Sequence, residues 1–344
     1  QFRFFIDGSG TFQNAANLAA IGQAKFEEAL LKISNFLQTH TNMNYLCYAG
    51  GCALNCMANG MLLKRSNFSN MFVPPAPNDA GTALGCAIYG LVDILEYKPE
   101  FKWQSDYLGE QSDISQSIKQ IDLGDQLILE QPENLQETVA NLLTQGNILA
   151  LFQGRSEFGP RALGNRSIIA DARYSVMTTW INQSIKGREW YRPVAPLVLE
   201  EDLSIIFETE FPSPFMQFAV PVKKEYQAII PAGNHVNNTA RLQTVSEKDN
   251  PFLYSLLQAF KCKTGVGALL NTSFNGRGET IVETLEEAIS CFQNTSIHIL
   301  IAPPYIIRKK NPPPSPLSLA SIYDISYNPQ KEGKSKKILV KSIK

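Results

Sequence analysis

The sequence predicts an α/β protein made of two consecutive parts. In the first part, a helix, a short strand, a glycine turn and a second helix follow one another between residues 24 and 63. In the second part, short apolar strands alternate with helices from residue 133 to 301. This order is typical of α/β layers, in which helices cover a sheet. A length of 344 residues leaves room for two domains.

The first part begins with apolar residues at helical spacing over 24–39, which predict an amphipathic helix. Residues 98–130 are polar and lack periodicity, so we expect them to connect the two parts. Between these segments the pattern predicts a strand at 45–49, a helix at 53–63, a strand at 71–73 and a helix from 78 to about 95.

The second part is expected to have helices at 133–143, 176–185, 253–260 and 285–292. Its strands are expected at 148–152, 194–199 and 266–270, with a final strand at 297–301. From residue 311 the chain is rich in Pro, Ser and Lys, which predicts a mobile or loosely packed tail.

Charge and composition exclude some classes of protein. The 31 basic and 32 acidic side chains give a net charge of −1, so no global field attracts nucleic acid or a membrane surface. No apolar run approaches the roughly 20 residues of a membrane helix. We expect the six cysteines to be reduced core thiols of a cytoplasmic protein. Because no Met begins the chain, a fragment or a processed form is expected.

The most informative segment, residues 151–173, carries four arginines around a Gly-Pro pair. A guanidinium group holds phosphate or carboxylate with paired hydrogen bonds, and neighbouring glycines let the backbone approach a ligand. A solvated helix would instead spread its charges at helical spacing. We therefore predict an anion-binding loop after a buried strand. Its arginines are Arg155, Arg161, Arg166 and Arg173.

A second basic group lies at 185–193, where Lys186, Arg188 and Arg192 stand beside Trp190 and a following proline. A surface charge run is the usual explanation of such a segment. The aromatic and proline neighbours argue against a plain solvated helix.

Polar side chains also follow the strand expected at 266–270. Ser273 and Asn275 are two residues apart and would point to one side of an extended strand end, next to Asn271. A hydroxyl and an amide together orient a planar carbonyl or amide group. A local Asx or Ser turn is the alternative.

Two motifs of the first part each have two interpretations. Gly50 and Gly51 either direct a helix N-terminus toward a phosphate or form a tight turn with close helix–strand packing. Asp79 is expected as the N-cap of the following helix, and a carboxylate ligand at a nucleotide or metal site is the alternative.

Together these motifs resemble the O-carbamoyltransferase family of nodulation and antibiotic biosynthesis, whose members place a carbamoyl group on a hydroxyl of a sugar or natural product. The resemblance covers about residues 20–310. It rests on Ala-Gly-Gly-Cys-Ala-Leu-Asn at 49–55, Asn-Asp-Ala-Gly-Thr-Ala-Leu-Gly at 78–85, Glu-Phe-Gly-Pro-Arg-Ala-Leu-Gly-Asn-Arg-Ser at 157–167, the segment from Lys186 to Arg192, and Leu-Asn-Thr-Ser-Phe-Asn at 270–275.

The resemblance implies a partial Kae1-like lobe, of the actin/sugar-kinase type, followed by a YrdC-like α/β domain. The Kae1-like portion would cover residues 1–108 and a linker 109–124. The YrdC-like domain would cover 125–310, and 311–344 would be the tail.

The resemblance also implies roles for the basic residues. Arg161, Lys186 and Arg192 would hold carbamoyl phosphate and the phosphates of ATP, which enters with Mg²⁺. Ser273 and Asn275 would lie against the carbamoyl group and the nucleotide. The product would be carbamoyladenylate, formed by positioning and charge neutralisation. Further substrate- or nucleotide-binding residues would be Arg155, Arg166, Arg188, Arg241 and Asn271.

In the Kae1-like portion, Gly50, Gly51 and Asn55 would contact the nucleotide, and Asp79 would bind a divalent metal, with iron as the expected ion. That site transfers the carbamoyl group to a hydroxyl acceptor. The family's His-x3-His metal motif does not precede Gly50, so the first lobe and most metal ligands would be missing. A separate polypeptide supplying that lobe is one hypothesis.

A second departure lies at 235–241, where the family tends to have His-Val-Asp-Gly-Thr-Ala-Arg. This chain has Asn237 and Asn238 in place of Asp and Gly, and it retains Arg241. The lost carboxylate would weaken a metal or amine contact. Two alternatives stay open: a degenerate nucleotide- or RNA-binding protein without catalysis, and a protein related to tRNA threonylcarbamoylation.

Overall fold

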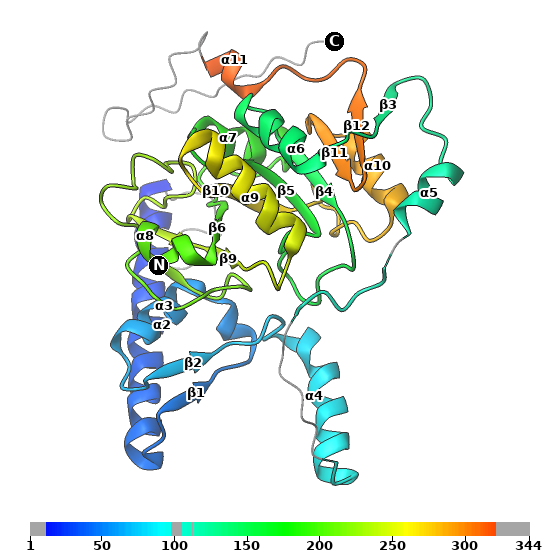
Figure 1. Cartoon of the computed structure of the whole chain (residues 1–344). Helices are drawn as coiled ribbons and strands as arrows, with labels where there is room; N and C mark the ends of the chain where they lie inside the picture. Colours follow the sequence, from blue (N-terminus) through cyan, green and yellow to red (C-terminus); the bar gives the residue numbers. More distant parts are fainter. Residues whose placement is uncertain (1–11, 98–104, 112, 321–344) are drawn as a thin grey trace.

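The computed structural model describes residues 12–97, 105–111 and 113–320 (Figure 1). The expectations for residues 1–11, for 98–104 and 112 of the connection, and for 321–344 of the tail lie outside the described residues. The predicted mixed α/β class is confirmed: a lobe with a small sheet precedes a larger body with helices on both faces of a sheet.

The N-terminal lobe contains the predicted order of helices and strands. The long helix α2 packs along α3, and β1 pairs in parallel with β2. Asn55 caps α3, because its Oδ1 accepts a hydrogen bond from the backbone N–H of Ala58 at 3.1 Å. The bounds are α2 (Phe12–Thr41), β1 (Tyr45–Cys47), η1 (Gly51–Leu54), α3 (Cys56–Arg65), β2 (Asn70–Phe72), η2 (Asp79–Gly81), α4 (Thr82–Tyr89) and the π-helical turn η3 (Gly90–Ile94).

The connection is more ordered than the sequence predicts. Helix α5 (Ile114–Gln120) lies within the expected linker and begins at Asp113, whose carboxylate accepts the Gln116 N–H at 3.0 Å. Strand β3 (Leu127–Glu130) then pairs with β12 (Tyr305–Lys309) at the edge of the main sheet. Only the first residue of β3 is buried, so its sequence carries no alternation from which a strand is predicted.

The main sheet has eight strands in the order β3-β12-β11-β4-β5-β10-β6-β9 (Figure 1). It is mixed: β11 with β4 and β6 with β9 are parallel, and the other neighbours are antiparallel. The remaining bounds are β4 (Leu149–Phe152), β5 (Arg166–Asp171), β6 (Ala195–Leu199), β9 (Gln243–Val245), β10 (Ala268–Ser273) and β11 (Ile299–Ala302).

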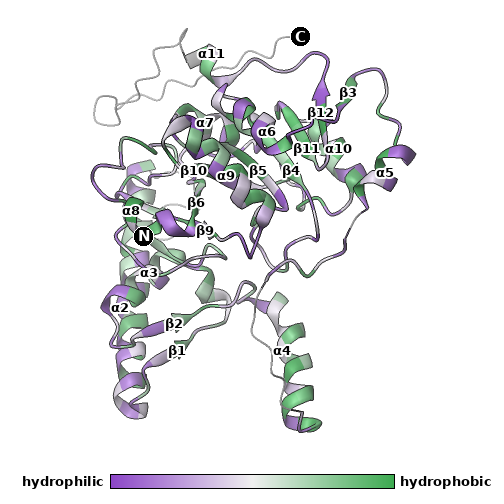
Figure 2. Cartoon of the chain, in the orientation of Figure 1, coloured by the Kyte–Doolittle hydropathy of each residue, from purple (hydrophilic) through white to green (hydrophobic). Residues whose placement is uncertain are grey.

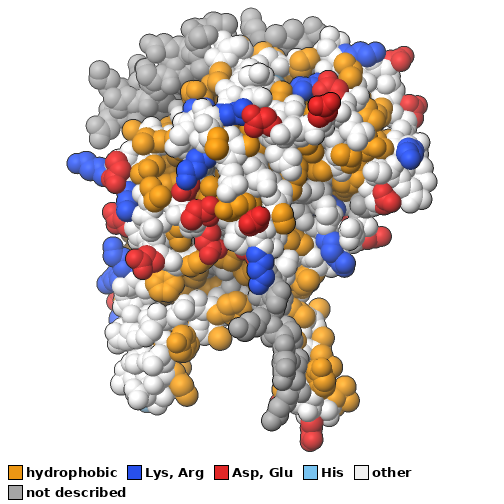
Figure 3. All heavy atoms as spheres, viewed as in Figure 1, with side chains coloured by type: hydrophobic (Ala, Val, Ile, Leu, Met, Phe, Trp, Pro, Cys, Tyr) orange, Lys and Arg blue, Asp and Glu red, His pale blue; other side chains and the backbone are white. Residues whose placement is uncertain are grey.

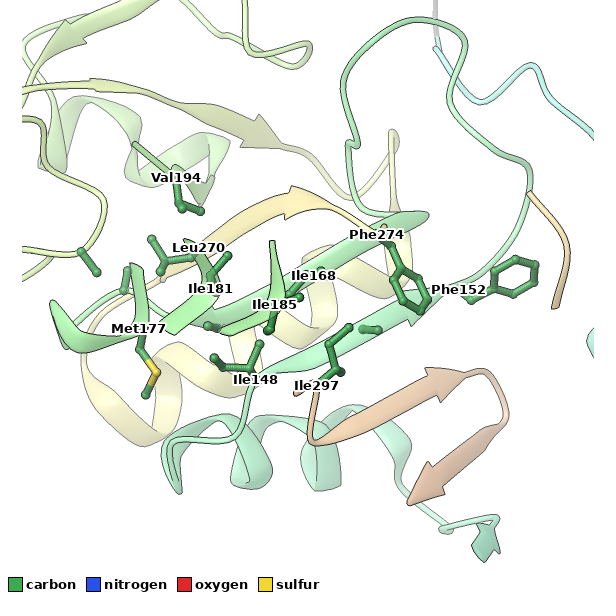
Figure 4. Packing of buried hydrophobic residues seen from close by; sticks show 14 of the residues in the cluster. Ile148, Phe152, Ile168, Met177, Ile181, Ile185, Val194, Leu270, Phe274 and Ile297 are labelled. Carbon is green, nitrogen blue, oxygen red and sulfur yellow. The ribbon is translucent and has the colours of Figure 1, made fainter. Parts of the chain in front are cut away.

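Both faces of this sheet are buried, which explains the continuous apolar runs of the central strands. Leu149 and Leu151 face the layer of α6 (Leu135–Thr144) and α9 (Pro251–Thr264). Ala150 and Phe152 face the core on the other side of the sheet, which three further helical segments cover. Figure 4 shows Phe152, Ile168 and Ile185 in that core. Its helices are α7 (Val176–Trp180), the π-helical turn η4 (Ile181–Ile185) and α10 (Leu285–Gln293).

Several expectations are corrected by the structure. The second half of the predicted loop 151–173 is the buried central strand β5, whose polar Arg166 and Ser167 hide the strand pattern. The strand at 299–302 is not the last, because β12 follows it as an antiparallel hairpin partner. Other elements are too short to show a hydrophobic periodicity in the sequence and were not predicted: η5 (Glu200–Asp202), α8 (Leu203–Ile206), β7 (Ala219–Pro221), β8 (Thr239–Arg241) and α11 (Pro316–Ala320).

The described start of the tail is packed against the body. Leu317 contacts the core, and Ser315 Oγ donates a hydrogen bond to the Gly146 carbonyl at 3.2 Å. His298, in the body, has Nε2 at 3.3 Å from the Pro314 carbonyl. Residues 311–320 are therefore held by the body, contrary to the expectation of loose packing.

Most of the cysteines lie outside the core, contrary to the expectation that they are core thiols. Cys291 is buried, Cys56 is half-buried, and the other four are exposed. Those in the N-terminal lobe lie on short elements with few buried residues, so apolar sequence neighbours did not indicate burial. The exposed ones are Cys47, Cys52, Cys86 and Cys262.

The N-terminal lobe exposes large apolar side chains on two helices. On α2 they include Ile33 and Phe36, and on the limb formed by α4 and η3 they include Tyr89 and Leu91. Figure 2 shows this limb as largely hydrophobic, and Figure 3 shows apolar side chains along it. Within the described part of the chain, no helix combines the length and apolar character needed to cross a membrane.

Candidate functional site

Three residues that the sequence marks as site residues meet at the end of β10. The Lys186 ammonium donates hydrogen bonds to Ser273 Oγ at 3.1 Å and to Asn275 Oδ1 at 2.5 Å. It also contacts the backbone carbonyls of both residues. Ser273 Oγ donates to Asn275 Oδ1 at 2.7 Å. We call Lys186, Ser273 and Asn275 the lysine cluster.

Local structure fixes the lysine cluster. Lys186 follows η4, whose Ile181 and Ile185 are buried, and Gly187 turns the chain with φ of 54°. Ser273 is the last residue of β10, which lies between β5 and β6. The lysine is therefore held between a packed helical turn and a central strand.

Burial changes the acidity of Lys186. Its side chain is taken out of water, and Arg188 adds a like charge nearby, so the pKa of the ammonium falls to about 7. A buried cation of this kind is stabilised by a nearby anion, because the anion offsets the lost hydration.

Three arginines extend this positive charge toward the N-terminal lobe. Burial, together with the charges of Arg161 and Arg188, lowers the pKa of Arg241 to about 10. Arg188 acts in the same way on Lys186. We call Arg161, Arg241, Arg188 and Lys186 the cationic strip. Among the described residues, no ion pair joins any of these four to a carboxylate.

Arg161 reaches the seam between the lobe and the body. Its Nη2 donates a hydrogen bond to the Leu54 carbonyl at 3.5 Å, just before α3. Burial lowers the pKa of Arg161, and Cys56, the first residue of α3, lies within electrostatic range of it. A helix N-terminus and two guanidinium groups thus approach one place, which favours an anion.

The buried side chain of Glu157 fixes the conformation of the loop that carries Arg161. Its Oε1 accepts the backbone N–H groups of Leu163 at 2.6 Å and Asn165 at 2.8 Å, while burial raises the pKa of the carboxyl. Gly159 has φ of 129°, and a Cβ there would lie 2.9 Å from the Pro75 carbonyl oxygen. Glycine therefore allows the loop to lie directly against the N-terminal lobe.

Two predicted binding arginines hold the protein together instead of lining the strip. Arg166 is fully buried, donates to the Gln153 carbonyl at 2.7 Å and lies 3.9 Å above the Phe152 ring centroid. Arg155 is on the surface, where its Nε donates to the Gly109 carbonyl at 2.8 Å.

The remaining basic and amide candidates have defined partners. Arg188 Nε donates to Asn182 Oδ1 at 2.8 Å, which orients it along the strip. Arg192 is exposed and pairs with Glu189 at 2.8 Å. Asn271 is buried in β10 and donates to Gln243 Oε1 at 2.7 Å, so its amide links β10 to β9.

The candidates of the N-terminal lobe are less closely gathered. Gly50 has φ of 100°, which favours glycine, but a Cβ at Gly50 or Gly51 would meet nothing within 4 Å. The interpretation that these two glycines allow close helix–strand packing is therefore wrong. Asn55 caps α3 and also exchanges amide hydrogen bonds with Gln23 of α2, at 2.8 and 3.2 Å.

Asp79 is exposed and is the first residue of η2. The expectation that it caps a helix is wrong, because Asn78 holds that position and no side chain there accepts the capping hydrogen bond. Across the ranges that the structure describes, no three His, Cys, Asp or Glu side chains gather closely enough to hold a metal ion. The described residues therefore do not form a complete metal centre around Asp79.

The sequence did not mark His235 as a site residue. The ring lies on the seam beside Arg241, whose charge acts on it, and Nδ1 is 3.1 Å from Thr239 Oγ1. The available signal was the spacing of His235, Thr239 and Arg241, which places them along one short hairpin.

Comparison with known proteins gives two family matches. The model for the carbamoyltransferase N-terminus matches residues 3–88, and the model for the carbamoyltransferase C-terminus matches residues 140–309. The nodulation protein NolNO of Sinorhizobium fredii is 40% identical over 302 residues, which are 85% of this chain and 44% of that protein.

A 3′-hydroxymethylcephem-O-carbamoyltransferase of Amycolatopsis lactamdurans is 35% identical over 256 residues, covering 74% of this chain and 47% of the relative. The chain spans about half the length of the curated relatives it matches. Among solved structures, HypF of T. kodakarensis superposes with a TM-score of 0.36 and 16% identity, over 54% of this chain and 23% of that one.

Proposed function

Since the chain belongs to the carbamoyltransferase family, we propose that it binds ATP and carbamoyl phosphate along the cationic strip and forms carbamoyladenylate. Water cleaves carbamoyl phosphate to carbamate and phosphate. A carbamate oxygen then attacks the α-phosphorus of ATP, and the bond to pyrophosphate breaks. The reaction needs charge neutralisation and alignment more than a covalent contribution from the protein.

One observation carries this proposal: the cationic strip lacks carboxylate partners. Burial and Cys56 shift the pKa of both Arg161 and Arg241, and the charges of Arg161 and Arg188 also act on Arg241, with no carboxylate among these groups. Arg173 differs in this respect, since it is paired with Asp171 at 2.7 Å. Cations kept partly buried without a counterion favour a polyanionic ligand.

The hydrogen bonds suggest how the strip is divided. Lys186, already fixed by Ser273 and Asn275, would neutralise the nucleotide phosphates at the end of β10. Arg161 and Arg241 would hold the acyl phosphate at the seam, near the first turn of α3. ATP would enter as its magnesium complex.

The second half-reaction would move the carbamoyl group to a hydroxyl-bearing small molecule, the acceptor class that the cephem carbamoyltransferases suggest. Asp79 does not supply a metal centre with the other described residues. We therefore propose that a further lobe, in the same or a separate polypeptide, completes the transfer site. The exposed apolar side chains of α2 and α4, including Phe36 and Tyr89, would support its docking.

Two other features support details of the proposal. The six cysteines are free thiols, as expected for a cytoplasmic protein. The net charge of −1 favours small anionic substrates over RNA, whose binding would depend steeply on salt.

The test measures pyrophosphate release from ATP with and without carbamoyl phosphate. Release that depends on carbamoyl phosphate is expected, and Arg161→Ala should reduce it at least a hundredfold, on the order of the loss of one charged transition-state contact. Arg308→Ala is the matched control, because Arg308 pairs with Glu130 at the far edge of the sheet, at 2.8 Å. No release by the folded wild type would contradict the proposal.

A further inference from the structure

Two buried polar atoms at the seam have no hydrogen-bond partner within the described residues. They are Arg241 Nε, which can only donate, and Nε2 of His235. The charge of Arg241 acts on the His235 ring, so the two groups lie in one electrostatic environment. Buried polar atoms are normally satisfied, and an unsatisfied pair at a candidate site points to a missing ligand.

The hydrogen bonds of His235 determine its tautomer. Its Nδ1 lies 3.1 Å from Thr239 Oγ1, and that hydroxyl donates its hydrogen to Asn237 Oδ1 at 2.8 Å. The shorter contact assigns the hydroxyl hydrogen to Asn237 Oδ1, ahead of Met57 Sδ at 3.8 Å, so Thr239 Oγ1 accepts the hydrogen bond from Nδ1–H of the ring. Burial and, to a smaller extent, the charge of Arg241 together lower the pKa of His235 to about 4, so the ring is neutral near pH 7. Nε2 is then a bare acceptor.

The strand geometry puts this acceptor on the same side of β8 as the Arg241 donor. Thr239 and Arg241 are alternate residues of β8, so their side chains leave the strand on the same face. The His235 ring is bonded to Thr239 on that face, and Thr239 Oγ1 lies 3.8 Å from Met57 Sδ of α3. The donor and the acceptor therefore both face the seam, where Arg161 donates to the Leu54 carbonyl.

We propose that His235 and Arg241 recognise the carbamoyl group itself, with its –NH₂ donating to His235 Nε2 and its carbonyl oxygen accepting from Arg241 Nε–H. This assignment rests on the proposed function and specifies which end of the acyl phosphate lies there. A carbamoyl group presents an acceptor and a donor side by side, matching the two free atoms. A phosphate group presents only acceptors when fully ionised, and an acetyl group has a methyl where the –NH₂ would be.

The residues first expected to face the carbamoyl group are already engaged. The oxygens of Ser273 and Asn275 accept from Lys186, and the Asn275 amide nitrogen donates to the Glu279 carbonyl at 2.7 Å. Their hydrogen-bonding capacity is largely used within the protein. His235 and Arg241 thus offer the better match for discrimination between acyl groups.

The test compares the affinities of carbamoyl phosphate and acetyl phosphate by calorimetry. The wild type should prefer carbamoyl phosphate by about threefold to tenfold, which is the usual net effect of one hydrogen bond. His235→Asn keeps a donor toward Thr239 but loses the acceptor at Nε2, so it should lose this preference while acetyl phosphate binding stays within about twofold. His40→Asn, on the exposed face of α2, is the matched control.

Three results would overturn the assignment. The preference could persist in His235→Asn, both ligands could weaken equally, or the wild type could show no preference. Failure of the wild type to bind either acyl phosphate would instead contradict the proposed function, and this assignment with it.

A second measurement does not depend on a stable variant. The chain has three histidines, so ¹⁵N-labelled imidazole signals are few. His235 should show a proton on Nδ1 and a bare Nε2 whose resonance moves when carbamoyl phosphate is added, but not with acetyl phosphate. A proton on Nε2 in the free protein would overturn the assignment.

Discussion

Replacing Lys186 by Met should separate ligand binding from folding. The pKa of this lysine falls from 10.5 to about 7 in the folded protein. At about 1.4 kcal/mol for each pKa unit, keeping the ammonium charged in place costs on the order of 5 kcal/mol. Met retains the length of the side chain without that cost, although it leaves the oxygens of Ser273 and Asn275 without their donor.

The sign of the pH effect follows from this shift. Between about pH 7 and 10.5 the unfolded chain binds a proton at Lys186 more tightly than the folded chain, so the free energy of unfolding rises with pH in this window. Lys186→Met should lose that rise. Denaturant unfolding at several pH values measures it.

ATP binding gives the sharper assay. At about pH 8.5 Lys186 is mostly neutral in the free protein, and a bound phosphate should restore its charge, so nearly one proton is taken up per ATP. Calorimetry in two buffers of different ionisation enthalpy measures this uptake. Lys186→Met should abolish it and weaken ATP binding about tenfold to a hundredfold.

The matched control is Lys309→Met. Burial also lowers the pKa of Lys309, to about 8, but its ammonium donates to the Thr295 carbonyl at 2.5 Å, away from the cationic strip. This variant should keep both proton uptake and affinity. If Lys186→Met still took up a proton, or if the wild type bound ATP without uptake, the assignment of Lys186 to the phosphates would be wrong.

Two further predictions concern buried ionisable residues outside the cationic strip. Burial, with the nearby charge of Glu157, raises the pKa of Asp106 from 3.8 to about 8, so the folded state holds this proton more tightly and loses stability as pH rises between these values. Asp106→Asn should remove that loss, and equal pH dependence in urea unfolding of both proteins would refute it. Arg166→Met should lower the free energy of unfolding by about 2–4 kcal/mol, because the Gln153 carbonyl loses its buried donor and Phe152 its cation; a change below about 0.5 kcal/mol would contradict this structural role.

The sequence predicted the lysine cluster well because its members lie at chemically constrained positions. Ser273 and Asn275 end a long apolar strand, and Lys186 ends a helix with buried Ile181 and Ile185. A polar group at the end of a buried strand or helix lies where the packed core ends, so such groups from adjacent elements meet at a shared edge of the sheet. Their meeting could therefore be expected before the structure was known.

Arg166 shows where such reasoning fails. In the sequence it belongs to the same run of arginines as Arg161, and both look like anion ligands. In the fold, the register of β4 and β5 puts Arg166 opposite Phe152, inside the sheet, while Arg161 stays in the loop and reaches the Leu54 carbonyl. Residue type gives the chemistry that is available, but strand register decides which face a side chain occupies.

The sequence by itself determined the α/β class and the order of the main elements, and it predicted an anion site with Lys186, Arg161 and the strand end at Ser273. These follow from local periodicity and from side-chain chemistry. Only the tertiary structure brought His235 into the environment of Arg241, because the position of both residues depends on a short hairpin held against α3 of the other lobe. Contacts between segments so distant along the chain are set by packing, which local pattern does not encode.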